Sequence, residues 1–467
     1  MSDYPRDLVG YAGNPPHAHW PGNARIAINF VINYEEGSEN NILHGDAASE
    51  AFLSEIVGAT PWPGQRHMNM ESIYEYGSRA GFWRLRDLFA ARGMPVTVFG
   101  VATALARNPA AVAAMKDANW EIASHGLKWI DYKDFSAADE RAHIVEAVRL
   151  HEQVVGARPL GFYQGRASEH TLALTIEDGG FLYSADSYAD DLPYWHEQQL
   201  IVPYTLDAND MRFATPQGFN SGDQFFAYLR DSFDFLYEEG TVRPKILSVG
   251  LHCRLVGRPG RAAALARFLD PVRKHDDVWV ATRLDIARHW IAKHPPAAGY
   301  VPSRMGRALF VEAFGGIFEH TPQIAERAHA QGLRAAQDTA DGLHAALAAA
   351  MREMTHDEQL ALIRAHPDLA GRLAQTGALT ADSTQEQASS GLDRLTPEEL
   401  GQFTAWNTNY QARFGFPFIM AVKGATKDDI AGAFQRRLIN APDAEFAEAL
   451  TQIERIALLR LRDRLPG

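Results

Sequence analysis

The sequence predicts an α/β fold for the first part of the chain, a barrel of alternating strands and helices, followed by an all-α helical bundle. Short β-rich runs alternate with amphipathic helical stretches up to about residue 293, whereas from Met305 onward nearly every segment is helix-like. The stretch between them is rich in proline, glycine and small residues, as linkers are. A chain of 467 residues is also too long for one comfortable core. We therefore expect domains at 1–297 and 305–467, joined by a linker at 298–304.

The strand-like runs of the first domain are short and β-rich. The first of them, RIAINFVINY at 25–34, ends in polar residues, and the first helical stretch, at 77–93, closes on glycine. Further strands are expected at 95–99, 120–124, 159–163, 181–185, 245–251 and 278–281, and further helices at 108–118, 136–155, 168–177, 222–239 and 261–274. Strands that alternate with helices pair in parallel, which favours a barrel, although an open doubly wound sheet fits the same order.

The second domain shows helical spacing throughout. Helices are expected at 341–354, 356–365, 396–414 and 445–465. No strand-like alternation interrupts them, a pattern that is typical of an all-α bundle.

Composition and charge exclude several classes of protein. The net charge of -13 argues against a nucleic-acid surface, which would carry a basic stripe. The single cysteine, Cys253, excludes an internal disulfide framework and a cysteine-rich zinc site. The first twenty residues lack the apolar run of a signal peptide, and the most apolar stretch, from Val96 to Ala106, is about half as long as a membrane span. We expect a cytoplasmic protein with neither nucleic acid nor membrane as a partner.

Polar residues that could carry chemistry follow the predicted strands of the first domain. They are Asn33, Glu35, Glu36, His125, Gln164, Arg166, Asp186, Asp190, Asp191, His252 and Arg254. In parallel β/α folds the active site lies at the carboxyl ends of the strands, so these side chains should converge. Each one alone also has a structural explanation, because an acid after a strand often caps the next helix and a lone histidine is usually structural. Their joint position on one rim is what favours an active site.

Two motifs resemble the polysaccharide-deacetylase superfamily, and the resemblance covers about residues 25–290. NYEE at 33–36 stands where that family has an Asp-Asp pair, and SHGLKW at 124–129 stands where it has His-x-x-x-His. In the family the second Asp and both His hold a divalent metal, and the first Asp acts as the base. The resemblance implies a deformed (β/α) barrel of the polysaccharide-deacetylase type.

Trp129 occupies the place of the second metal-binding histidine. Its indole nitrogen carries a proton and has no lone pair to offer a metal. Two protein ligands remain, Glu36 and His125, where catalytic zinc normally has three. Metal binding should therefore be weak or absent, and we assign no metal ligand.

The altered set Glu36, His125 and Trp129 is similar to that of the cofactor-independent (PuuE-type) allantoinases, a branch of this superfamily. Further stretches that fit the branch are 124–132, 162–172, 186–195 and 250–261. The resemblance implies hydrolysis of the hydantoin ring of (S)-allantoin to allantoate, with no cofactor.

Opening a cyclic amide needs an activated water, a stabilised oxyanion and a proton for the departing nitrogen. Adjacent carboxylates repel, so one of Glu35 and Glu36 can hold a raised pKa, and which of them is the base stays open. His125 and His252 are alternative proton carriers. The expected substrate contacts are Trp129, Arg166, Asp190 and Arg254, of which the arginines could hold the ureido oxygen. Trp129 also fits simple core packing, and an arginine near a rim is often only solvated.

Three motifs mark the second domain: AHPDL at 365–369, STQEQ at 383–387 and FGFPFI at 414–419. Singly, they fit a helix boundary before proline, a capping box and an aromatic turn. Together they resemble the OHCU decarboxylases, which act on 2-oxo-4-hydroxy-4-carboxy-5-ureidoimidazoline, over about residues 310–465. The resemblance implies that His366 and Glu386 are catalytic. The implied substrate contacts are Pro367, Ser383, Gln387, Phe418, Ile419 and Arg460.

Decarboxylation leaves electron density that the substrate ring can delocalise, so neither metal nor organic cofactor is obligatory. A shaped pocket and a His–Glu pair that moves one proton near neutral pH suffice. The two resemblances support each other, because the decarboxylase product is (S)-allantoin, the substrate of the first domain. We therefore expect a bifunctional enzyme of urate breakdown that takes small ureides, and family resemblance suggests a homo-oligomer.

Three alternatives stay open for the chain. A metal-dependent carbohydrate deacetylase fused to a helical module would have histidine in place of Trp129. A non-catalytic binding protein would turn over ligand in neither pocket. A hydrolase for another cyclic ureide would share the same site residues.

Overall fold

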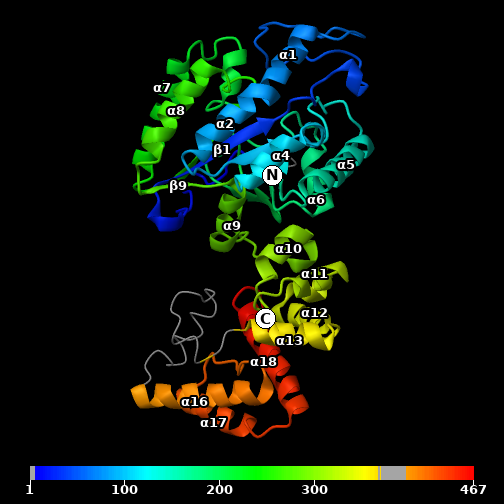
Figure 1. Ribbon diagram of the computed structural model, residues 1–467. Helices are drawn as coiled ribbons and strands as arrows, with labels where there is room; N and C mark the ends of the chain where they lie inside the picture. The colour runs from blue at the N-terminus through cyan, green and yellow to red at the C-terminus, as the bar shows by residue number, and fades with distance from the viewer. Residues whose placement is uncertain (1–5, 367–368, 370–395, 467) are drawn as a thin grey trace. The chain divides into compact units, whose positions relative to one another are not determined.

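The computed structural model describes residues 6–366, 369 and 396–466, which form two compact units, Met1–Pro295 and Pro296–Gly467 (Figure 1). The predicted linker, 298–304, lies inside the second unit, where Pro302–Arg304 form the short 3-10 helix η5. Each unit is described here by itself.

The first unit is built on a curled, mostly parallel sheet whose centre is β1 (Ile26–Tyr34), a strand that is buried along its whole length. The strand order is β6-β7-β5-β4-β3-β2-β1-β8, and β9 (Val278–Val280) also pairs with β1. The other bounds are β2 (Thr97–Gly100), β3 (Glu121–Ser124), β4 (Gly161–Phe162), β5 (Tyr183–Ser184), β6 (Tyr194–His196), β7 (Gln199–Ile201) and β8 (Lys245–His252).

The strand order confirms the deformed barrel over the doubly wound sheet. From β1 to β5 neighbouring strands follow one another along the chain, whereas a doubly wound sheet reverses its order at a switch point. Among the strands of the described residues, only β6 and β7 pair antiparallel, as a short hairpin that the sequence pattern did not reveal.

The register of the sheet brings the carboxyl ends of its central strands together. Asn33 of β1 lies opposite Phe99 of β2 and His252 of β8, and Ser124 of β3 lies opposite Gly100. The loops that follow β1, β3 and β8 therefore start at the same edge, which is where the predicted site residues stand.

Helices cover the sheet of the first unit (Figure 1). They are α1 (Met68–Tyr76), α2 (Phe82–Ala90), α3 (Ala102–Arg107), α4 (Pro109–Asp117), α5 (Ala137–Val155), α6 (Thr171–Asp178), α7 (Gly222–Glu239), α8 (Pro259–Val272) and α9 (Arg283–Lys293). The predicted helices are all present, but α1, α3 and α9 were not anticipated. The predicted helix at 77–93 begins as a π-helical turn, η3 (Gly77–Gly81), which joins α1 to α2.

The core of this unit forms where alternate side chains of β1 meet the helices. Phe30 packs against Phe89 of α2 and Phe268 of α8, with ring centroids 5.2 and 6.4 Å away. All three side chains are almost completely buried. This packing fixes β1, and so fixes the loop that follows it.

The described residues of the second unit form helices and no strand, which confirms the all-α prediction. The helices are α10 (Arg307–Phe314), α11 (Gln323–Ala330), α12 (Ala340–Arg352), α13 (His356–Ala365), α16 (Pro397–Phe414), α17 (Lys427–Arg437) and α18 (Pro442–Arg462). Capping boxes at Thr355, Thr396 and Thr426 start α13, α16 and α17. Among the described residues, no helix is both long and apolar enough to cross a membrane.

Candidate active sites

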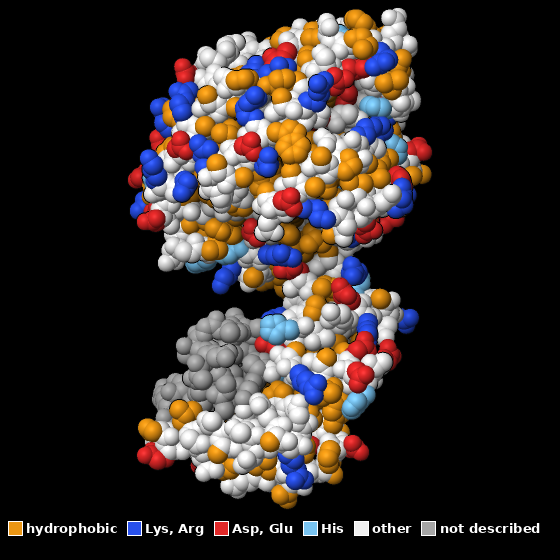
Figure 2. Space-filling model, viewed as in Figure 1, with side chains coloured by type: hydrophobic (Ala, Val, Ile, Leu, Met, Phe, Trp, Pro, Cys, Tyr) orange, Lys and Arg blue, Asp and Glu red, His pale blue; other side chains and the backbone are white. Residues whose placement is uncertain are grey.

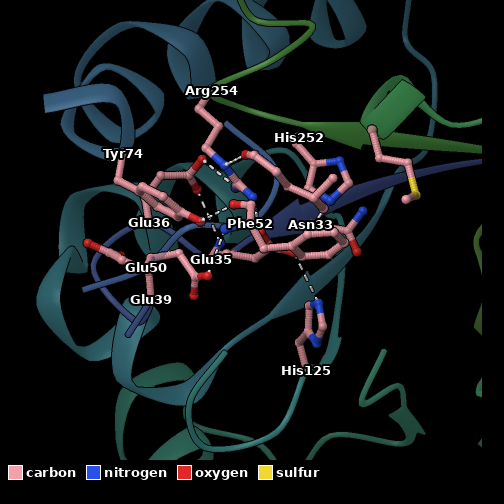
Figure 3. Close-up of polar contacts among 12 residues, drawn as sticks. Asn33, Glu35, Glu36, Glu39, Glu50, Phe52, Tyr74, His125, His252 and Arg254 are labelled. Carbon is pink, nitrogen blue, oxygen red and sulfur yellow. Dashed lines mark hydrogen bonds and ion pairs between the residues drawn. The ribbon is translucent and has the colours of Figure 1, made fainter. Parts of the chain in front are cut away.

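The first candidate site gathers two imidazoles and a guanidinium around one carboxylate, that of Glu35 (Figure 3). Glu35 Oε1 lies 3.3 Å from His125 Nε2 and 3.4 Å from His252 Nε2. Glu35 Oε2 lies 2.7 Å from Nη2 of Arg254. These side chains come from the ends of β1, β3 and β8, as the sequence predicts, and all are buried.

Asp210, which the sequence analysis missed, orients His252. Its Oδ1 lies 2.6 Å from His252 Nδ1, and its Oδ2 accepts the backbone N–H of His252 at 2.8 Å and of Val256 at 2.9 Å. Asp210 belongs to η4 (Asp210–Ala214), in a loop without strand pattern. A parallel bridge between Asn209 and Gly250 brings that loop to β8, and nothing in the local sequence signals such a contact.

The surroundings push the pKa values of the acid and the imidazole apart. Burial by itself would raise the pKa of Glu35, but the charges of Arg254 and His252, with hydrogen bonds from both histidines, hold it well below its usual value. Burial opposes a charged His252, yet the carboxylates of Glu35 and Asp210 raise the pKa of this imidazole to about 9. At neutral pH the site therefore holds an ionised carboxylate beside an imidazolium.

Glu36 faces away from the cavity and packs against the start of η3. Its Oε2 accepts the backbone N–H of Glu35 at 3.1 Å. Burial raises the pKa of Glu36 to about 7, against the lowering effect of Arg254. Burial likewise raises the pKa of Glu39, on the same loop, to about 7. The pKa values of the two adjacent carboxyl groups therefore differ, as expected, and Glu36 is the weaker acid.

A cavity of about 550 Å³ opens onto Glu35, His125 and His252. Trp129 and Arg166 form part of its wall, and the Arg166 guanidinium lies over the indole at 4.2 Å from the ring centroid. The remaining lining residues are Asn33, Phe52, Leu53, Asp131, Tyr163, Gly165, Tyr188, Tyr204, Leu206, Asn209 and Met211. The volume suits a small ligand.

The structure does not bring two of the predicted contacts to this cavity. Arg254 is completely buried behind Glu35 and is absent from the lining. Asp190 lines a neighbouring cavity of about 770 Å³, where its Oδ1 accepts the N–H of Leu192. On the same loop, Asp186 accepts the N–H groups of Gln164 and Gly165 at 2.7 Å each. Burial raises the pKa of Asp186 to about 6.

The residues at the family's metal position do not fit a metal ion. Trp129 is buried against Phe52 and Tyr74, with an arginine over the indole. The cation that Glu36 faces is Arg254, 3.7 Å away. In the described parts of the chain, no group of three or more His, Cys, Asp or Glu side chains is placed to hold a metal.

The second candidate site is described in part. His366 is buried at the end of α13, with Nδ1 2.9 Å from the carbonyl of Leu362. Arg460 of α18, which was predicted to contact the substrate, forms an ion pair with the carboxylate of Glu319 at 2.8 Å. The predicted residues Pro367, Ser383, Glu386 and Gln387 lie outside the described residues.

The backbone expected to contact the second substrate is held by a buried arginine. Arg437 Nη1 donates to the carbonyl of Ile419 at 2.6 Å, and its guanidinium lies over the ring of Phe418 at 4.4 Å. Arg437 also pairs with Glu445 at 2.7 Å. Sequence reasoning missed this support, because α17 and α18 place Arg437 and Glu445 together only in the fold.

The surface of the first unit carries acidic and basic side chains intermixed on the face shown in Figure 2. A basic stripe of the kind that binds nucleic acid is not seen on that face, in keeping with the net charge of -13.

Comparison with known proteins follows the division into two units. The polysaccharide deacetylase family model matches residues 69–178, and the OHCU decarboxylase model matches residues 303–462. A Schizosaccharomyces pombe protein, provisionally named a polysaccharide deacetylase, is 42% identical over 62% of this chain and 98% of its own length. The 2-oxo-4-hydroxy-4-carboxy-5-ureidoimidazoline decarboxylase of Haloferax volcanii is 41% identical over 35% of this chain and 92% of its own.

A parallel, curled α/β sheet with acids and imidazoles at its strand ends places the first unit in the polysaccharide deacetylase class, and the second unit is an OHCU decarboxylase-type bundle. The chain belongs to both families, one through each unit. Within the first family, the crystal structure of PuuE allantoinase is 58% identical, with a TM-score of 0.62, over 63% of this chain and 99% of that one.

Proposed function

We propose that the chain is a bifunctional enzyme of urate breakdown. The second unit decarboxylates 2-oxo-4-hydroxy-4-carboxy-5-ureidoimidazoline to (S)-allantoin, and the first unit hydrolyses the hydantoin ring of (S)-allantoin to allantoate. The observation that carries the proposal is the identity of 58% across 99% of PuuE allantoinase, in a chain that also spans 92% of an OHCU decarboxylase.

In the first unit, His252 is the acid that protonates the departing ring nitrogen. Its pKa of about 9 keeps it charged at neutral pH, and Asp210 holds Nδ1 so that Nε2 faces the cavity. An acid must lie within hydrogen-bond reach of the atom it protonates, and His252 lines the cavity wall.

Glu35 is the group that accepts the proton of the attacking water. It is ionised, it lines the cavity, and its Oε1 lies between the two imidazoles. His125 holds the same oxygen from the other side and so fixes the direction in which the carboxylate points. The assignment of base and acid follows the pKa values of the two neighbouring groups, of which that of Glu35 is lowered and that of His252 is raised.

Substrate binding falls to the part of the cavity wall that Arg166 and Trp129 form. Arg166 presents its guanidinium to the cavity while it is held by Glu50 at 3.5 Å and by the faces of Trp129 and Phe52. A planar guanidinium in that position suits the ureido carbonyl. Trp129 acts as a platform rather than as a direct donor.

In the second unit, His366 and Glu386 move the proton that follows loss of CO2, with Pro367, Ser383, Gln387 and the Phe418–Ile419 backbone as substrate contacts. The described part supports this through the buried His366 and the fixed carbonyl of Ile419. Arg460 supports the pocket through Glu319.

The first activity is tested by incubating the purified chain with racemic allantoin and following ring opening by NMR. One enantiomer should be consumed and allantoate should form, and treatment with a chelator should leave the rate unchanged. An N-acetylated oligosaccharide serves as the rival substrate. No reaction with either allantoin enantiomer would contradict the proposal, and chelator-sensitive deacetylation would favour the carbohydrate deacetylase.

The second activity is tested by supplying freshly prepared 2-oxo-4-hydroxy-4-carboxy-5-ureidoimidazoline and recording circular dichroism of the product. A variant inactive in the first unit, such as His252→Asn, lets the product accumulate. Optically active (S)-allantoin is expected, whereas formation of the racemate at the spontaneous rate would exclude catalysis.

A cytoplasmic location and a homo-oligomeric state belong to the same proposal. The single, buried Cys253 suits a reducing compartment, and family resemblance supports an oligomer. Cell fractionation and light scattering of the purified chain test the two statements.

A further inference from the structure

The guanidinium of Arg254 lies completely buried beside the two adjacent carboxylates of the first site (Figure 3). Nη2 lies 2.7 Å from Glu35 Oε2 and Nη1 lies 3.7 Å from Glu36 Oε1. Nε donates to the carbonyl of Leu53 at 3.0 Å. A single arginine therefore forms ion pairs with both carboxylates.

Two aromatic rings pack against this guanidinium. The guanidinium carbon lies 4.3 Å from the centre of the Tyr74 ring and 5.0 Å from the centre of the Trp129 ring. Arginine does not lose its proton in proteins, and Arg254 has no exposed surface through which to reach solvent. Its positive charge is therefore a permanent part of the site.

The guanidinium lies against two of the three positions at which the family binds its metal, those of Glu36 and Trp129. A metal held by Glu36 would need to lie about 2.0–2.2 Å from the carboxylate oxygen. It would then be a second cation close to a fixed cation that is completely buried. Like charges repel strongly in such surroundings.

We propose that Arg254 is the built-in cation of the first site, which supplies the positive charge beside Glu35 and Glu36 and excludes divalent metal ions. The loss of the metal site then has two causes, the tryptophan at position 129 and the buried charge of Arg254. Restoring an imidazole at position 129 alone does not restore a metal site, because the competing charge is still present. The inference concerns ion binding and does not depend on which reaction the site catalyses.

Arg254 is on this proposal a positioning residue, because it acts through Glu35 and does not line the cavity. It holds the carboxylate of Glu35 from the side opposite to the two imidazoles. A structural role alone would predict loss of stability on replacement, but no gain of metal binding.

The test measures zinc binding to the full chain by titration against a chromophoric chelator, in the wild type, Trp129→His, Arg254→Met and the double variant. The wild type and both single variants should bind no zinc at the first site. The double variant should bind zinc stoichiometrically, at least about 100-fold more tightly than any binding that Trp129→His shows, because the like charge beside the metal position is removed.

Arg166→Met combined with Trp129→His is the matched control, since Arg166 also stacks on the indole but pairs with Glu50. It should bind no more zinc than Trp129→His alone. Circular dichroism and thermal unfolding check that each variant folds, and Arg254→Gln, whose polar head can still donate to Leu53, replaces Arg254→Met if that chain does not.

Either of two results overturns the proposal. Stoichiometric zinc in Trp129→His alone would show that the indole is the whole barrier. A folded double variant that binds no zinc would show that Arg254 does not exclude the metal. Because zinc is measured directly, both results are distinct from any failure to hydrolyse allantoin.

Discussion

Asp210 determines the charge state of the catalytic imidazole. Its two oxygens accept the His252 Nδ1–H and two backbone N–H groups, so neither is left to rotate. The carboxylate thereby orients the ring and, together with Glu35, raises the pKa of His252 to about 9. Loss of this charge would lower that pKa toward the ordinary value of the side chain.

Asp210→Asn should lower kcat for allantoin hydrolysis about 10²–10⁴-fold, because the acid is then neutral and less well oriented. The basic limb of the pH profile should move down from about pH 9. The measurement is kcat/KM as a function of pH. The control is Asp207→Asn, which removes another carboxylate of the same loop. Asp207 accepts hydrogen bonds from Thr205 and Tyr228, and its replacement should leave the basic limb of the pH profile unchanged.

The same pair makes the stability of the first unit depend on pH. The folded chain keeps the His252 proton to about pH 9, whereas the unfolded chain releases it near the ordinary pKa of about 6.5. This contribution is therefore complete below about pH 6.5 and is lost as the pH rises toward 9. Asp210→Asn should flatten that slope, and an unchanged slope in urea unfolding would contradict the assignment.

The buried pair of Arg460 and Glu319 should be strongly coupled. Replacement of one partner, by Arg460→Met or Glu319→Gln, breaks a buried ion pair and should cost roughly 3–5 kcal/mol of second-unit stability. The double variant should cost clearly less than the sum. A double-mutant cycle from urea unfolding measures the coupling, and additive losses would show that the pair is not a unit.

At the residue scale the strand-end rule predicted Glu35, His125 and His252, because parallel strands must end at one edge. It could not predict Asp210, which reaches the site through a bridge between distant segments. It also assigned Arg254 to the substrate. Position after a strand says that a residue is near the site, but not on which side of the loop its side chain lies.

The π-helical turn η3 determines how closely helix and site approach each other. Gly77 faces the Glu36 carboxylate so closely that a Cβ there would lie 2.3 Å from Oε1. At Gly81, a Cβ would lie 1.9 Å from the carbonyl of Cys253. The joint between α1 and α2 therefore packs directly on the loops that carry the acids and Arg254, and π turns often occur at such sites.

Gly77→Ala should displace Glu36 and lower both stability, by about 1–3 kcal/mol, and allantoin turnover. Gly260→Ala in α8 is the matched control, since a Cβ there meets nothing within 4 Å. Thermal unfolding and kinetics of both variants give the comparison. Equal behaviour of the two would show that the close approach at Gly77 has no consequence.

At the element scale, periodicity predicted the long amphipathic helices and the longer strands. It failed for α1, whose end continues into a π turn rather than a cap, and for α9, whose start is marked by the capping box at Thr282 and Asp285. The hairpin of β6 and β7 was also missed, although the equally short β9 was predicted. Short or irregular elements are set by tertiary contacts that periodicity does not contain.

The two units should be catalytically independent of each other. His252→Asn should abolish ring opening yet leave decarboxylation unchanged, so that (S)-allantoin accumulates in proportion to the substrate supplied. His366→Asn should do the converse. Both reactions are followed by NMR on the full chain, and loss of both activities in either variant would contradict the division of labour.

At the scale of the whole molecule, the change from alternating strands and helices to helices alone predicted both fold classes. The residues 298–304, predicted as a linker, fall within the second unit, which starts at Pro296, and include η5. Proline and glycine content indicates where a chain turns. Because a proline also starts η5, composition alone does not separate a linker from a short helix.

The burial of the sole cysteine has a practical consequence. Cys253 has no exposed surface, and burial raises the pKa of its thiol, so maleimide dyes should not label the folded wild type. Cysteines introduced at the strongly exposed Val242 and Ile439, one in each unit, would then be the sole reactive thiols. Fluorescence energy transfer between them could follow the separation of the two units while both substrates are turned over.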